Sequence, residues 1–152
     1  MSSAMTATTG ADVTVTPAPA TGPIVLGIAS GASALAGLAH YAAIPAHRAE
    51  WPAAALLFTV VGAFQVLWPV LVRVHPRRAL WWTALAVNVG LLALWTLSRT
   101  TGMPFGPEAG EPEHIGVLDT IASASELIVV AALLVRPHLL SRATRPAESP
   151  AD

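Results

Sequence analysis

Long apolar segments separated by short polar ones dominate the chain. Four such segments, residues 23–44, 51–72, 79–98 and 117–136, each contain about 20 mainly apolar residues. A helix of about 20 residues is about 30 Å long, which matches the hydrocarbon core of a bilayer. The pattern therefore predicts an all-α fold, a polytopic membrane protein whose single domain, residues 23–136, is a bundle of four transmembrane helices.

Composition agrees with a membrane protein, because 54% of the residues are hydrophobic and only 11% are charged, against about 25% charged in a typical soluble domain. Residues 1–22 contain no Lys or Arg and so lack the basic region of a signal peptide. We expect a disordered cytoplasmic tail there and a second cytoplasmic tail over residues 137–152. The absence of cysteine excludes disulfides, thiolate metal sites and cysteine nucleophiles.

The distribution of arginine predicts the orientation. Six arginines flank one side of the predicted bundle, and only two flank the other. The six are Arg73, Arg77, Arg78, Arg136, Arg142 and Arg145, and the two are Arg48 and Arg99. By the positive-inside rule both termini are cytoplasmic (N-in/C-in) in a multi-pass protein of the plasma (inner) membrane. The expected partner is the lipid bilayer, and no nucleic-acid partner is expected.

Polar residues near the middle of the apolar segments predict a midplane polar layer made of Gln65, Asn88, Ser123 and Glu126. A carboxyl at this depth costs about 2–3 kcal/mol even on the mildest insertion scale. We therefore expect Glu126 to face inward, toward Asn88 or Gln65. Two interpretations stay open: hydrogen bonding that holds the helices together, and a group that handles protons or ions.

A second group of histidines and acids is predicted nearer the outer surface. His40 and Asp119 fall at a similar height, His40 about 10 Å above the centre of its span, and the outer loops add His47, Glu50 and His114. We expect His40 and Asp119 to pair at the floor of an outward-facing pocket. Because imidazole and carboxylate suit Zn²⁺, Mn²⁺ or Fe²⁺, one hypothesis is a divalent metal site made of these five residues. The alternative is solvated or helix-capping side chains, and no haem is expected.

The segment between the third and fourth spans is rich in glycine and proline, which predicts a defined series of turns and not a helix. Its characteristic residues are Arg99, Gly102, Pro104, Gly106, Pro107 and Glu113. Together with Asn88-x₆-Trp95, His40…His47-x₂-Glu50-Trp51 and Asp119-x₆-Glu126, this loop resembles small, uncharacterised four-helix bacterial integral membrane proteins. The resemblance spans about residues 36–135 and implies the architecture, but no activity.

Two classes of function follow. In the first, the protein handles an ion or a small solute through the outer His/carboxylate pocket and the midplane polar layer. In the second, it is a non-catalytic membrane module that packs with a larger complex or forms a homo-oligomer through the small-xxx-small spacing of Gly27 and Gly31. Catalysis is less favoured, because no nucleophile and base pair is evident, and no cofactor is identified.

Overall fold

The computed structural model describes the backbone of residues 21–143 and the side chains of residues 22–135. It contains four helices, α1 (Thr21–Glu50), α2 (Pro52–Val74), α3 (Arg78–Thr100) and α4 (Val117–Ala143). All four are long and apolar enough to cross a membrane. The predicted all-α, four-helix architecture is therefore confirmed. Residues 21–22 and 137–143, which were predicted to belong to the two tails, are instead helical, and residues 1–20 and 144–152 lie outside the described residues.

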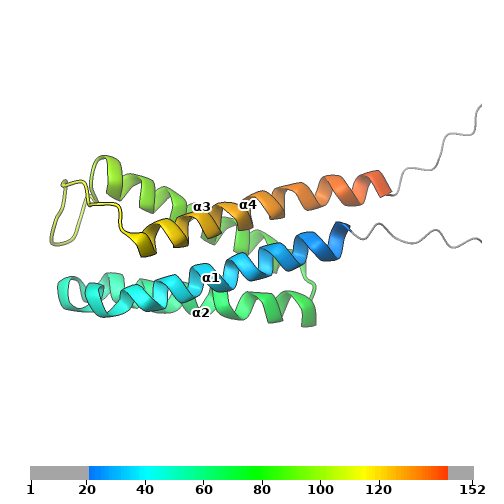
Figure 1. Cartoon of the computed structure of the whole chain (residues 1–152), viewed down its shortest axis with the longest axis horizontal. Coiled ribbons are helices and arrows are strands. Elements are labelled where there is room, and N and C mark those ends of the chain that lie inside the picture. Colours follow the sequence, from blue (N-terminus) through cyan, green and yellow to red (C-terminus); the bar gives the residue numbers. More distant parts are fainter. Residues whose placement is uncertain (1–20, 144–152) are drawn as a thin grey trace, which may run out of the picture.

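The four helices run alternately up and down, so that each is antiparallel to the next in sequence (Figure 1). One end of the bundle carries the start of α1, the end of α4 and the turn between α2 and α3 (Figure 1). The opposite end, called here the loop end, carries the junction of α1 with α2 and the loop of residues 101–116 (Figure 1). Helix α1 packs most extensively, on α2 and α4, whereas α2 and α3 share the least contact of the packed pairs.

Two glycines bring α1 and α2 together. A Cβ atom added to Gly37 would lie 2.8 Å from the carbonyl oxygen of Gly62, and one added to Gly62 would lie 3.2 Å from the carbonyl oxygen of Gly37. The two backbones can approach this closely only because neither residue has a side chain. Gly27 and Gly31 behave differently, since both are exposed and a Cβ on either would meet no described atom within 4 Å.

Candidate functional site

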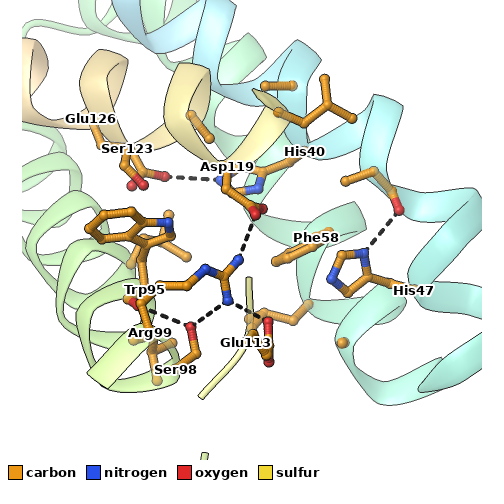
Figure 2. Close-up of a pocket in the computed structure, with 18 of the residues that line it drawn as sticks. His40, His47, Phe58, Trp95, Ser98, Arg99, Glu113, Asp119, Ser123 and Glu126 are labelled. Atoms are coloured by element: carbon orange, nitrogen blue, oxygen red, sulfur yellow. Dashed lines mark hydrogen bonds and ion pairs between the residues drawn. The ribbon is translucent and has the colours of Figure 1, made fainter. Parts of the chain in front are cut away.

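A pocket of about 120 Å³ lies at the loop end, lined by residues of all four helices and of the 101–116 loop (Figure 2). Its walls are largely apolar and aromatic, with Trp51, Phe58 and Trp95 as the aromatic members. Its polar lining residues are His40, His47, Ser98, Arg99, Glu113, Asp119, Ser123 and Glu126. Residues far apart in sequence thus converge on one cavity.

The inner end of the pocket opens onto a buried polar network. Glu126 is 1% exposed, and its Oε1 lies 2.9 Å from Nε2 of His40 and accepts a hydrogen bond from Nε2 of Gln65 at 3.3 Å. The same Gln65 nitrogen donates to Oδ1 of Asn88, also at 3.3 Å. The expected contact of Glu126 with Gln65 is confirmed, and Asn88 joins the network through Gln65. Each of the four helices contributes one member.

The contact between His40 and Glu126 needs one hydrogen, carried either by Nε2 of the imidazole or by Oε1 of the carboxyl. Both side chains line the pocket. The pair therefore places an imidazole and a carboxyl in mutual contact at the inner end of the cavity.

A proline in α2 explains the position of Ser33. Pro69 lies inside α2 and has no N–H, so the carbonyl of Gln65 loses its normal intrahelical donor. The Ser33 hydroxyl of α1 donates to this carbonyl at 2.8 Å, and Ser33 is 1% exposed. A side chain of a neighbouring helix thus satisfies the carbonyl that the proline leaves unpaired.

We expect Ser33→Ala to lower the free energy of unfolding by about 1–3 kcal/mol, because the buried Gln65 carbonyl would lose its donor. In a Pro69→Ala background the restored N–H supplies that donor, so the loss should fall below about 0.5 kcal/mol. Reversible unfolding in detergent, measured for both single variants and the double variant, gives the coupling. Equal losses in the two backgrounds would contradict the compensation.

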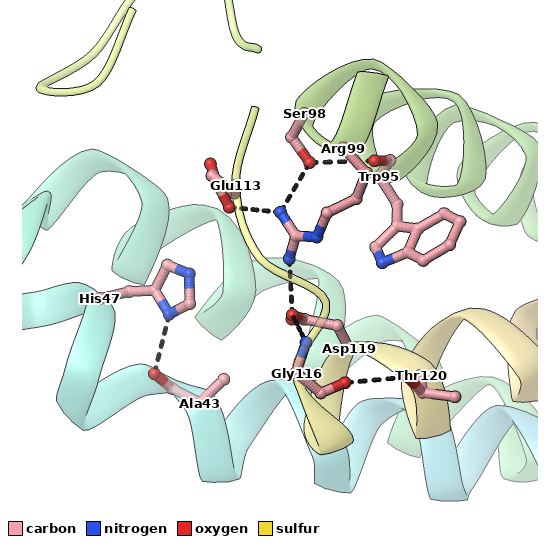
Figure 3. A network of polar contacts seen from close by, with 9 residues as sticks. All are labelled: Ala43, His47, Trp95, Ser98, Arg99, Glu113, Gly116, Asp119 and Thr120. Atoms are coloured by element: carbon pink, nitrogen blue, oxygen red, sulfur yellow. Dashed lines mark hydrogen bonds and ion pairs between the residues drawn. The ribbon is translucent and has the colours of Figure 1, made fainter. Parts of the chain in front are cut away.

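Arg99 connects α3, the loop and α4 (Figure 3). Its Nη1 forms an ion pair with Glu113 and donates to Oγ of Ser98, and its Nη2 forms an ion pair with Asp119. The Arg99 side chain is only 9% exposed, and Oδ2 of Asp119 also accepts a hydrogen bond from the Gly116 N–H at 3.0 Å. One guanidinium therefore fixes the start of α4 and the end of the loop to α3.

The predicted pairing of His40 with Asp119 differs from the structure. Both residues line the pocket as expected, but His40 bonds Glu126 and Asp119 bonds Arg99. The physical reason is charge: Arg99 offers Asp119 a full positive charge and a geometry suited to carboxylates. Its position at the last turn of α3 allows the side chain to reach back into the bundle.

The five residues considered as metal ligands are not gathered into one ligand set. Within the described part of the chain, no three His, Asp or Glu side chains could hold a metal ion. His47 directs Nδ1 to the carbonyl oxygen of Ala43 at 3.0 Å, whereas Glu50 and His114 are exposed and do not line the pocket. Three of the five, His40, His47 and Asp119, therefore line the pocket without forming a ligand set with the other two.

Glycines with positive φ shape the 101–116 loop, which contributes Met103 and Glu113 to the pocket lining. Gly102 has a φ of 75°, and a Cβ there would lie 2.5 Å from the backbone nitrogen of Glu111. Gly106, with a φ of 109°, would place a Cβ 3.2 Å from the Trp51 ring, which also packs against Phe105 at 5.8 Å between ring centres. Pro104 lies between these glycines and Pro107 follows the second. A side chain at Gly102 would collide with backbone, so the loop depends on this glycine for its close approach.

The sequence did not predict that three aromatic residues would together form a wall of the pocket. Trp51, Phe58 and Trp95 all line it, and Phe58 also packs against both His40 and His47 at 4.9 and 4.5 Å between ring centres. A signal was present for Trp95, which precedes Arg99 by four residues and so lies on the same face of α3. Comparison of the chain with protein-family models, with curated proteins and with solved structures gave no match.

Proposed function

We propose that the four helices cross the plasma membrane, with both termini on the cytoplasmic side and the loop end on the outer side. The outward surface of the bundle supports a lipid environment, since large apolar side chains are exposed on all four helices. Examples are Ile28, Leu56, Val60, Leu67, Val89 and Leu127. The arginine distribution supports the direction, because the turn between α2 and α3 contains Arg77 and adjoins Arg73 and Arg78.

In this orientation the protein admits a small solute or ion to the loop-end pocket, where the His40 and Glu126 pair exchanges a proton with it. One observation carries this proposal: Glu126 both lines the pocket and forms the centre of the buried network. Glutamine could also join the helices through hydrogen bonds, and it has no ionised form whose insertion the membrane would penalise. A carboxyl at the bottom of a pocket is therefore best explained by its proton chemistry.

Cysteine labelling in intact cells tests access to the pocket, and the chain has no native cysteine to interfere. Ser123 lines the pocket, whereas Ser125 is 3% exposed and does not. A Ser123→Cys variant should react with a small membrane-impermeant thiosulfonate at least about tenfold faster than Ser125→Cys, since a thiol must be reached from water to react. Ala109→Cys in the loop serves as the positive control, and Ala143→Cys at the end of α4 as the cytoplasmic control.

Each labelling outcome bears on a separate part of the proposal. Reaction at position 143 but not at position 109 would reverse the orientation. Reaction at position 109 with equally slow reaction at positions 123 and 125 would contradict an outward-open pocket, and with it the proposed function.

Self-assembly is the second candidate function, and one observation favours it. Gly27 and Gly31 lie on an exposed face of α1 with Ile24 and Ile28, and no other described part of the chain covers them. In a bilayer, a face of this kind allows two helices to approach closely. This candidate predicts a homodimer whose interface lies away from the pocket.

A further inference from the structure

Two buried N–H groups in the pocket wall have no acceptor in the part of the chain that the structure describes. Nε1 of Trp95 and Nε of Arg99 are both shielded from solvent, and neither has a hydrogen-bond partner among the described residues. Both residues line the pocket, and the Arg99 side chain is more than nine-tenths buried. The indole nitrogen lies on the edge of the ring that faces the guanidinium of Arg99 (Figures 2 and 3).

The two groups cannot satisfy each other, because indole and guanidinium N–H groups donate hydrogen bonds and accept none. A buried donor without an acceptor costs about 1–3 kcal/mol. Trp95 and Arg99 are four residues apart on α3, which places them on one face and directs both toward the same part of the cavity. One acceptor atom placed in the pocket can therefore serve both.

Charge decides what kind of acceptor fits. Arg99 already forms ion pairs with Glu113 and Asp119 through its terminal nitrogens. Two carboxylates beside one guanidinium leave an excess of negative charge, so an anionic ligand would be repelled. The acceptor that the site favours is a neutral oxygen.

The apolar lining residues and the volume of the pocket limit the polarity and size of a ligand. Trp51, Phe58, Leu91, Leu94 and Met103 surround the cavity with apolar surface. Its volume of about 120 Å³ is close to that of an engineered cavity of about 150 Å³ that binds benzene. A molecule with one six-membered ring matches these dimensions.

We infer that the loop-end pocket binds a small, neutral, mainly apolar molecule with one ring, whose carbonyl oxygen accepts hydrogen bonds from Nε1 of Trp95 and Nε of Arg99. The inference rests on one part of the proposed function, the access of a small solute to the loop-end pocket, and names the class of that solute. The oxygen lies toward α3, and the apolar ring lies against Trp51, at the junction of α1 with α2, and Phe58 of α2.

Three fluorinated probes of similar size test the inference by ¹⁹F NMR titration of the full-length protein in nanodiscs: 4′-fluoroacetophenone, 1-ethyl-4-fluorobenzene and 4-fluorobenzoate. Empty nanodiscs correct for partition into lipid. The ketone should bind saturably and about tenfold more tightly than the hydrocarbon, because only the ketone supplies the missing acceptor. The benzoate should show no saturable binding.

A matched pair of variants assigns the effect to the indole N–H. Trp95→Phe keeps an aromatic ring but removes Nε1, so it should weaken ketone binding about fivefold and leave hydrocarbon binding unchanged. Trp82→Phe is the control, because Trp82 is 68% exposed and does not line the pocket; it should leave the affinity for the ketone unchanged.

Several results would overturn the inference: equal affinity for ketone and hydrocarbon, preference for benzoate, no saturable binding of any probe, or unchanged ketone affinity in Trp95→Phe. Labelling of Ser123→Cys separates this failure from that of the proposed function. If the thiol reacts and the ketone does not bind, the pocket is open but takes another class of solute. If the ketone binds and the thiol does not react, the ligand class is correct and access from the outer aqueous side is wrong.

Discussion

Replacing Arg99 by methionine should destabilise the protein by about 3 kcal/mol. The change removes the shared partner of Glu113 and Asp119 and leaves two carboxylates side by side without a compensating charge. Glu113 is 37% exposed and water screens it, so most of the loss is expected from Asp119, whose side chain is 24% exposed. Thermal and denaturant unfolding in detergent, followed by near-ultraviolet circular dichroism, measures the change.

Two controls accompany the Arg99 variant. Arg48→Met removes an exposed arginine of α1 at the same end of the bundle and should change stability by less than about 0.5 kcal/mol. Asp119→Asn combined with Arg99→Met should recover about 1 kcal/mol or more, because the uncompensated charge is then removed. A loss in Arg99→Met no greater than in Arg48→Met would show that the ion pairs do not stabilise the fold.

Glu126→Leu should destabilise the protein by about 2–4 kcal/mol. Without the Glu126 oxygen, Nε2 of Gln65 loses one of its two acceptors and His40 loses its partner, all within a buried layer. Glu126→Gln keeps an oxygen in the same position and should lose no more than about 1 kcal/mol. The free energy of unfolding in detergent, measured for both variants, makes the comparison.

Equal stability of the Leu and Gln variants would contradict a hydrogen-bonded network around this residue.

The helices and the inward position of Glu126 were predictable because insertion energetics restrict them strongly. The length of each apolar segment predicts a helix. An acid in the middle of an apolar span must avoid lipid, so Glu126 is expected to contact a polar residue inside the bundle, and it contacts Gln65. The end of α1 was harder to predict: the predicted span ends at residue 44, whereas the helix continues through Pro45 to Glu50. A single proline removes only one intrahelical donor, and the bond from the Trp51 N–H to the His47 carbonyl at 2.7 Å shows that helical bonding resumes.

The partners at the loop end could not be predicted in the same way. Depth along a span gives the height of His40 and Asp119, but not which helices are neighbours or how each is rotated. Arg99 entered the sequence reasoning as an orientation marker and a loop residue, although its contacts with Glu113 and Asp119 organise the whole end of the bundle. Glu113 and Asp119 follow Arg99 by 14 and 20 residues, with an irregular loop between them, so no sequence periodicity indicates these pairs.

The close approach of Gly37 and Gly62 has a consequence for motion. Because α1 is joined closely to α2 and packs broadly on α4, these three helices are expected to move as one rigid body. Helix α3 has the weakest contact with α2, where the hydrogen bond from Trp68 Nε1 to the Leu80 carbonyl crosses the seam. We therefore expect any widening of the cavity to displace α3 relative to α2, and Trp95 and Arg99, which face the cavity from α3, to move with it.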